Sequence, residues 1–241
     1  MHLVISDLSR SFRTVKALEH VSMDTQSGRV TGLLGQNGAG KTTLLKLIAG
    51  LLKPDSGQVS IDGAPVRKSQ IGLLLGGDTG LYPNLTPREN IRYFADLHHV
   101  PEKVFNARLK EYGKQFSLDE YMDRPCGQLS RGTRQKTSII RAMIHNPEII
   151  LFDEPETGLD FETTESIMAF LRDSAAADKL VLYSSHSIGT ILTTCSTAVI
   201  LHYGKTVETL DVRQIQENHS ITEAYEIIER AVSSDAAKGD E

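Results

Sequence analysis

The sequence predicts an α/β fold: a mainly parallel sheet with helices on both faces, an N-terminal antiparallel β subdomain and an inserted α-helical subdomain. Three observations predict it. Short apolar runs of strand length alternate with helical stretches in the first third of the chain and again after residue 147. Residues 87–145 have a mostly amphipathic helical pattern. Near the N-terminus, two segments show the apolar–polar alternation of antiparallel strands.

The composition is that of a globular protein with one large domain or two small ones, since 39% of its 241 residues are hydrophobic and 24% are charged. The net charge of −5 argues against a protein that coats nucleic acid, so we expect no nucleic-acid partner. Cys126 and Cys195 lack metal-ligand spacing and fit a reducing compartment. Because neither a membrane span nor a signal peptide is evident, we expect a cytoplasmic protein.

Short elements fill the first 86 residues. Strands are expected at residues 3–8, 21–25, 30–34, 58–61 and 71–75. The third of these is a buried strand that leads straight into a glycine-rich turn. Residues 41–49 then have helical spacing that stops at Gly50, a typical residue at the end of a helix.

Buried strands return after the helical block, at residues 149–152, 180–183 and 198–201, with helical stretches at 161–177 and 187–195 between them. This alternation predicts parallel pairing under helices on both faces. We therefore expect a single domain over residues 1–232. Its expected parts are a core with the β subdomain, a helical subdomain, a C-terminal helical segment and, beyond it, a frayed tail: residues 1–86 with 146–210, 87–145, 211–232 and 233–241.

Residues 35–42, GQNGAGKT, match the phosphate-binding pattern G-x-x-x-x-G-K-[ST] and predict a P-loop NTPase core. Glycines let successive backbone N–H groups surround a phosphate, and the helix N-terminus adds partial positive charge. Lys41 is expected to reach the β- and γ-phosphates, and Thr42 to be a ligand of Mg²⁺. A chance match is disfavoured by the strand–loop–helix context. The nucleotide contacts expected here are Gly35, Gln36, Asn37, Gly38, Ala39, Gly40, Lys41, Thr42 and Thr43.

An acidic pair follows the apolar strand at residues 149–152. Asp153 and Glu154 stand at its carboxyl end, where sheets of this type place ligands. We expect Asp153 to hold Mg²⁺ through water and Glu154 to polarise the attacking water. Alone the pattern is weak, because a strand can also end in a solvated acidic turn. Together with the glycine-rich loop it is strong.

Further motifs, in the same order along the chain, resemble those of ABC ATPase subunits. Residues 129–135, LSRGTRQ, resemble the ABC signature, and residues 154–160, EPETGLD, resemble the D-loop. His186 is placed like the switch histidine of that family, and Phe12 like its aromatic A-loop residue. Because the motifs extend from Phe12 to His186, the resemblance covers nearly the whole chain.

The resemblance implies a dimer in which each ATP lies between the glycine-rich loop of one subunit and residues 130–132 of the other. Ser130 would offer a hydroxyl, and Gly132 would permit close approach of the backbone to the γ-phosphate. Asp160 would contribute to the nucleotide site from the D-loop. Hydrolysis would remove the shared charge and loosen the dimer.

The resemblance also implies individual roles in hydrolysis. Glu154 would be the general base or orient the water, and His186 would hydrogen-bond the γ-phosphate and the attacking water. Phe12 would stack on adenine, although a surface aromatic at the end of a strand is an equally good interpretation. ATP and Mg²⁺ are the ligands that this interpretation requires.

The sequence departs from the family pattern at two places. Gly76 stands where the family has the glutamine of its Q-loop, so that side-chain contact is lost or supplied elsewhere. Asp78 is a candidate substitute as a metal ligand, and a flexible glycine hinge is the alternative. In the signature, Arg131 replaces a glycine and Thr133 a glutamine, but Ser130 and Gly132 are present.

Residues 78–90, DTGLYPNLTPREN, resemble the ATPase subunits of ABC-2-type exporters, including NatA-like sodium-efflux and drug- or antibiotic-resistance branches. This implies a transmembrane permease as partner, a second ATPase subunit with a homodimer favoured over a heterodimer, and a peripheral position on the inner face of the cell membrane. Two alternatives stay open. One is a soluble ABC ATPase acting on a cytosolic complex, and the other is a weakly hydrolysing partner in a heterodimer, which Gly76 keeps open.

Overall fold

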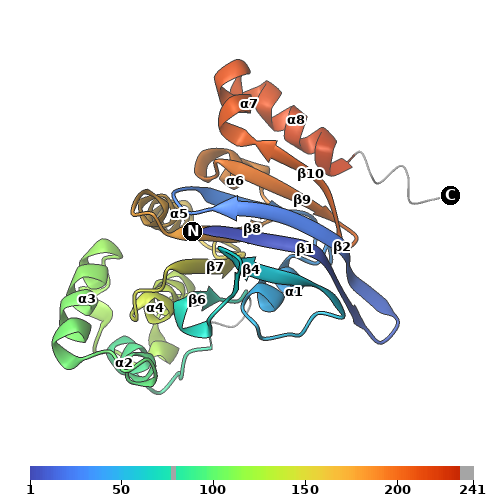
Figure 1. Cartoon of the computed structure of the whole chain (residues 1–241). Helices are drawn as coiled ribbons and strands as arrows, with labels where there is room; N and C mark the ends of the chain where they lie inside the picture. Colours follow the sequence, from blue (N-terminus) through green and yellow to red (C-terminus); the bar gives the residue numbers. More distant parts are fainter. Residues whose placement is uncertain (77–79, 234–241) are drawn as a thin grey trace.

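The computed structural model describes residues 1–76 and 80–233. An antiparallel sheet with the order β2-β1-β4-β5 forms one layer (Figure 1). Its strands are β1 His2–Phe12, β2 Val15–Gln26, β4 Ser56–Ile61 and β5 Ala64–Pro65. The alternating burial of β1 and β2 follows from the apolar alternation in the sequence, because successive side chains point to opposite faces of a strand.

A six-stranded sheet with the order β10-β9-β3-β8-β7-β6 forms the centre of the molecule. Its strands are β3 Val30–Leu34, β6 Ile71–Leu74, β7 Ile149–Asp153, β8 Leu180–Ser185, β9 Thr197–His202 and β10 Lys205–Asp211. Every pair is parallel except β9 with β10. The carboxyl ends of β3, β7 and β8 therefore lie side by side.

Helices cover both faces of this sheet, as predicted. The helices of the core and of its C-terminal end are α1 Lys41–Ile48, α5 Phe161–Ala176, α6 Ile188–Thr194, α7 Val212–Asn218 and α8 Ile221–Ser233. The inserted helices are α2 Pro87–Leu97, α3 Glu102–Gln115 and α4 Arg131–Met143, which gather beside β6 and β7 (Figure 1). Short 3-10 turns lie at Lys68–Gln70, Asp119–Tyr121 and Cys126–Gln128.

Two apolar cores lie on opposite faces of the central sheet, as the side chains of β7 illustrate. Ile150 and Phe152 point into a core built with the inserted helices and with α5, α6 and α8. Ile149 and Leu151 point to the other face, into a core with α1 and the antiparallel sheet. A continuous apolar run is therefore needed here, because both faces of the strand are buried.

The α/β architecture with its β subdomain and inserted helices is confirmed. Two strands have no counterpart in the prediction: β5, with two residues, and β10, all of whose residues are exposed or only partly buried. An edge strand of this kind lacks the apolar run that marks the buried strands. The division of the chain into domains stays a prediction.

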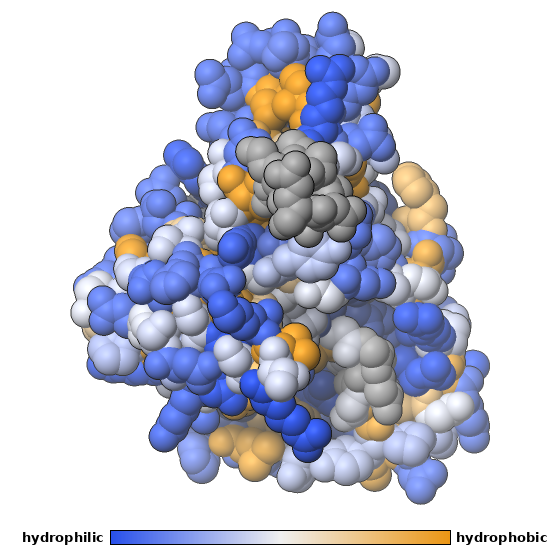
Figure 2. Space-filling view, turned by 90° about the vertical axis from the view of Figure 1, so that its right-hand side faces the viewer, coloured by the Kyte–Doolittle hydropathy of each residue, from blue (hydrophilic) through white to orange (hydrophobic). Residues whose placement is uncertain are grey.

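The described surface is mostly polar on the face shown in Figure 2, with small apolar patches, one of them at the end of the molecule that carries α7 and α8. Ile221 and Tyr225 of α8 are among the exposed large apolar residues. Within residues 1–76 and 80–233, no helix combines the length and apolar character needed to cross a membrane.

Candidate nucleotide-binding and hydrolysis site

The glycine-rich loop joins the carboxyl end of β3 to the first turn of α1. Gly38 and Gly40 have φ values of 86° and 103°, which side chains other than glycine rarely tolerate. A Cβ at Gly35 would stand 2.3 Å from the carbonyl oxygen of Leu201, so the loop packs directly on the end of β9. Glycine at these positions lets the backbone make the tight curve that a phosphate site requires.

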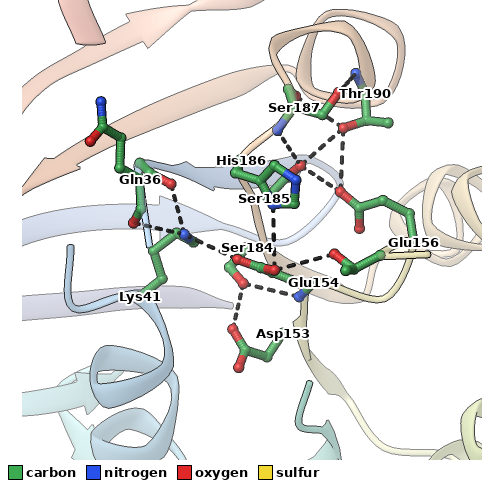
Figure 3. Close-up of polar contacts among 12 residues, drawn as sticks. Gln36, Lys41, Asp153, Glu154, Glu156, Ser184, Ser185, His186, Ser187 and Thr190 are labelled. Carbon is green, nitrogen blue, oxygen red and sulfur yellow. Dashed lines mark hydrogen bonds and ion pairs between the residues drawn. The ribbon is translucent and has the colours of Figure 1, made fainter. Parts of the chain in front are cut away.

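Lys41 begins α1 and is 4% exposed. Its Nζ donates hydrogen bonds to the carbonyl oxygens of Gly35, at 2.7 Å, and Gln36, at 3.2 Å (Figure 3). The same Nζ lies 3.2 Å from Oε1 of Glu154. The ammonium group is thus fixed at the centre of the loop, between the loop backbone and the acidic end of β7.

Asp153 ends β7 and is 4% exposed. Thr42 Oγ1 donates to its Oδ2 at 2.7 Å, and Ser184 Oγ donates to its Oδ1 at 2.6 Å. Thr42 and Asp153 thus bring two oxygen ligands together, although 111 positions separate them in the sequence. Hydroxyl and carboxylate oxygens are the donors that Mg²⁺ prefers, so this pair fits the ion.

Glu154 follows in a left-handed conformation, with φ of 46°. A glutamate rarely adopts it, and Ser184 holds it here, because the backbone N–H of Glu154 donates to both the carbonyl oxygen and the Oγ of Ser184 at 3.1 Å. Burial acts to raise the pKa of Glu154, but Lys41, His186 and Thr157 together outweigh it, so the pKa is lowered. The side chain is therefore a carboxylate at neutral pH.

His186 lies between β8 and α6, with half of its side chain exposed. Its Nδ1 is 3.4 Å from Oε2 of Glu154 (Figure 3). Ser187 caps the following helix, where its Oγ accepts the backbone N–H of Thr190. The structure thus brings together the two residues for which the sequence predicts a role in hydrolysis.

Two adjoining cavities lie beside these groups. The first, of about 340 Å³, is lined by Asn37, Thr42, Gly76, Arg131, Gln135, Asp153, Glu154 and Thr157. The second, of about 210 Å³, is lined by residues 15–17 of β2, residues 37–43 and Glu154. A larger cavity of about 590 Å³ includes Gly28 and Val30, at the start of β3, and contains no residue predicted for the site. The predicted chemistry, rather than volume, therefore locates the site.

Phe12 and Asp160 lie outside the residues that line the two cavities. Phe12 is 41% exposed at the end of β1, and the guanidinium of Arg10 lies 5.0 Å from the centre of its ring. Asp160 caps α5, where its Oδ1 accepts the backbone N–H of Thr163 at 2.8 Å. Hydrogen bonds from the backbone and side chain of Thr163 lower the pKa of Asp160. Within one chain, Asp160 thus has a capping role.

The signature residues stand at the start of α4. Ser130 is exposed and caps the helix, since its Oγ accepts the backbone N–H of Thr133 at 3.1 Å. The backbone at Gly132 packs closely against α5, since a Cβ at this position would lie 3.1 Å from Oγ1 of Thr163. An exposed hydroxyl at a helix N-terminus is thus presented at this surface.

Gly76 lines the larger of the two site cavities. A Cβ at this position would lie 3.1 Å from the carbonyl oxygen of Asp153 and 3.5 Å from its Oδ2. Glycine therefore lets the backbone pass close to the acidic strand end. The second candidate ligand, Asp78, lies outside the described residues.

Sequence reasoning missed several residues that support the site. Ser184 bonds both Asp153 and Glu154. Arg131 donates to the carbonyl oxygen of Thr157 at 2.7 Å, and Gln135 donates to that of Pro155 at 2.9 Å. The two serines at the carboxyl end of β8 were the available signal, since an adjacent parallel strand must bring them beside Asp153 and the residues after it.

Comparisons with known proteins agree with this geometry. The sequence matches the family described as ABC transporter over residues 18–157. It is 40% identical over 215 residues to the ABC transporter ATP-binding protein NatA of Bacillus subtilis (strain 168), covering 85% of this chain and 87% of that protein. It is 32% identical over 216 residues to the SkfA peptide export ATP-binding protein SkfE of the same strain, covering 88% and 90%.

A solved structure is similar over most of the fold. It is a dimeric ATP-binding cassette in a post-hydrolysis state with bound ADP and Pi, and it aligns with a TM-score of 0.79 and 25% identity over 88% of this chain and 99% of that chain. The phosphate loop after β3 and the acidic end of β7 are thus found in a fold that other proteins use with nucleotides. The chain belongs to the ABC transporter family, as an ATP-binding subunit with ATPase activity.

Proposed function

We propose that this subunit powers an ABC-2-type exporter by ATP-driven dimerisation. The observation that carries the proposal is the convergence of Lys41, Asp153 and Glu154 on one pair of cavities, with Nδ1 of His186 3.4 Å from Oε2 of Glu154. A cation for phosphate, a carboxylate for water and oxygen ligands for a metal are the parts that hydrolysis of a phosphoanhydride requires.

Each residue has a role that its position supports. Lys41 would exchange its bond with Glu154 for the β- and γ-phosphates of ATP, since both are anionic partners of the same ammonium group. Glu154, released from Lys41 and ionised, would accept a hydrogen bond from the attacking water and orient it. His186, next to Glu154, would bond the γ-phosphate and the water from the other side.

Thr42 and Asp153 would hold Mg²⁺, Thr42 directly and Asp153 through water. When bound, the ion would neutralise charge that develops on the phosphate oxygens. Ser184 orients the Asp153 carboxylate, so a third residue of the chain supports the pair.

We infer that a second ATPase subunit completes each site with Ser130 and Gly132. Both lie at an exposed helix start, and the similar cassette described above is dimeric. A homodimer is the simpler assembly. The partner of this dimer would be a transmembrane permease, which the subunits would bind from the inner face of the cell membrane, because the relatives are ATP-binding proteins of a transporter and of peptide export.

Export is favoured over import. NatA and SkfE align with this chain over most of their lengths, and SkfE is a peptide export ATP-binding protein by name. Ions such as sodium, drugs or antibiotics are the proposed cargo classes, and the permease would select among them. A weakly hydrolysing role is the second candidate, which Gly76 favours because glycine offers no side chain to the cavity.

The test is an affinity purification from native membranes with the Glu154→Gln variant loaded with ATP. Blocked hydrolysis should keep the ATP-bound dimer together through washing, so a polytopic membrane protein is expected in the eluate, identified by mass spectrometry. The Lys41→Ala variant is the matched control and should recover less of it. Recovery of soluble proteins alone, or of the subunit alone, would overturn the transporter proposal.

A further inference from the structure

Glu156 is a buried acid two positions beyond Glu154, with 9% of its surface exposed. Its Oε1 accepts a hydrogen bond from Ser185 Oγ at 2.5 Å and a longer one from Thr190 Oγ1 at 3.4 Å. Its Oε2 is buried and has no hydrogen-bond partner within the described part of the chain. Burying a carboxyl group without full hydrogen bonding costs free energy of folding, so its presence at this place suggests a function.

The hydrogen bonds of Glu156 extend to both sides of His186. Ser185 Oγ, which donates to Glu156, accepts the backbone N–H of Ser187 at 2.9 Å. Thr190, the second donor to Glu156, has its own backbone N–H bonded to Ser187 Oγ. Figure 3 shows that Glu156 lies against this turn, on the side where α6 begins. The residues before and after His186 are therefore held by one carboxyl group.

The segment that carries Glu156 is also attached to the signature helix. Arg131 and Gln135 of α4 donate to the carbonyl oxygens of Thr157 and Pro155, the two residues that flank Glu156. A displacement of α4 would therefore pull on Glu156 from both sides. Through Ser185 it would reach the loop of His186.

We propose that Glu156 is a positioning residue for ATP hydrolysis: it holds the loop of His186 in place and connects that loop to the signature helix α4. This inference rests on the proposed role of His186. Closure of the dimer on ATP would move α4, and the Glu156–Ser185 bond would move the loop of His186 toward the γ-phosphate at the same time. Hydrolysis would then be timed to closure by a contact within each subunit.

The chemistry of the site predicts which replacement retains the function. Burial raises the pKa of Glu156, and the nearby Glu154 carboxylate acts in the same direction, against the opposing effects of Ser185 and His186. These influences favour the neutral acid, for which glutamine is the closest substitute in shape and hydrogen bonding. Glu156→Gln retains an acceptor for Ser185, whereas Glu156→Ala removes it and leaves a cavity.

The experiment compares steady-state ATP hydrolysis by the full-length purified variants. Glu156→Ala is expected to lower kcat about ten-fold with the KM for ATP unchanged, the effect of losing transition-state contacts alone. Glu156→Gln is expected to restore kcat to within about two-fold of the parent protein. Ser185→Ala should lower kcat as much as Glu156→Ala does. The double variant should have a kcat no lower than that of the less active single variant, because the two substitutions remove the same connection. Glu162→Ala, at an exposed position of α5, is the control.

Three outcomes would overturn the inference. One is a normal kcat in Glu156→Ala alongside an inactive Glu154→Gln, which leaves the proposed function intact. Another is a loss in Glu156→Gln as large as in Glu156→Ala, together with a lower unfolding temperature in both, which would show a structural role only. The third is a rise in KM with kcat unchanged. Undiminished hydrolysis in Glu154→Gln would instead refute the proposed function itself.

Discussion

The phosphate loop and the signature helix are two functional regions with opposite surroundings. In the first, Lys41 and Asp153 are each 4% exposed, and their polar atoms bond to other parts of the same chain. In the second, Ser130 is exposed, and the hydrogen bonds of its Oγ stay within the first turn of α4. The difference supports the proposal that a chain builds one half of an ATP site and presents the other half to a neighbour.

Removing the central cation of the first region has the largest expected effect. Lys41→Ala should reduce ATP hydrolysis by at least about 100-fold, because the transferred phosphate loses a preorganised positive charge. Phosphate release measures the rate, and Lys46→Ala, in the same helix, is the control. Activity within a few fold of the parent protein would remove Lys41 from the mechanism.

A change in the second region should act on hydrolysis without weakening the first. Ser130→Ala should lower turnover about ten-fold, while binding of ATP to the monomer stays unchanged, because the monomer's own loop supplies that affinity. Loss of the helix cap should also cost about 1 kcal/mol of stability. Ser130→Thr, which preserves the cap and the hydroxyl, is the matched control. Weaker binding to the Ser130→Ala monomer would contradict the separation of the two regions.

Arg131, like Gln135, attaches the signature helix to the segment after β7, and its loss should have a smaller effect. Arg131→Ala removes the bond to the carbonyl oxygen of Thr157, so turnover should fall about five-fold, the equivalent of about 1 kcal/mol. Steady-state kinetics of Arg131→Ala and Arg131→Lys measure it, with partial retention expected for lysine. An increase in turnover would instead show that this bond restrains hydrolysis.

The smallest expected effect on turnover lies at the junction of the helical subdomain with the sheet, where His98 and His145 stack with ring centres 3.8 Å apart and affect stability instead. Burial, followed by the neighbouring His98, lowers the pKa of His145 to about 4, and Arg108 and Lys179 act in the same direction against a hydrogen bond to Ile71. Between pH 6.5 and 4 the unfolded chain binds a proton that the folded protein does not. The contribution of His145 to the free energy of unfolding is therefore fully present above pH 6.5, and it declines as the pH falls toward 4.

Denaturant unfolding of the parent protein and of His145→Gln, at pH 7 and at pH 4.5, measures that decline. Between these two pH values the free energy of unfolding should fall further in the parent protein than in the variant. The difference between the two falls should be at most about 3 kcal/mol, and solvent exposure of the ring makes it smaller. Equal losses in both proteins would show that His145 is an ordinary histidine in the folded state.

Most of the first region could be predicted from sequence because its constraints are local. The loop needs glycines at fixed spacing, and Lys41 and Thr42 follow directly in the helix. The buried strands are recognisable because burial on both faces requires continuous apolar runs. β10 lacks such a run, since it pairs on one side only and lies at the edge of the sheet.

The supporting contacts could not be predicted because they depend on which strands are neighbours. Ser184 meets Asp153 only because β8 pairs with β7 in that register. Likewise, Arg131 replaces a glycine of the family pattern, and its contact with Thr157 requires α4 to lie over the segment after β7. Residue type gave no sign of Glu156 as a buried group, because most glutamates are exposed.

The central claim, that one chain holds half of each ATP site, is tested most directly by sedimentation velocity of the Glu154→Gln variant. It should sediment as a monomer without nucleotide and as a dimer with ATP. Adding Ser130→Asp, at an exposed position, should abolish the dimer while ATP still binds, because a carboxylate would then face the phosphates of the other subunit. A monomer under both conditions with ATP bound, or a dimer that is insensitive to Ser130→Asp, would contradict the account.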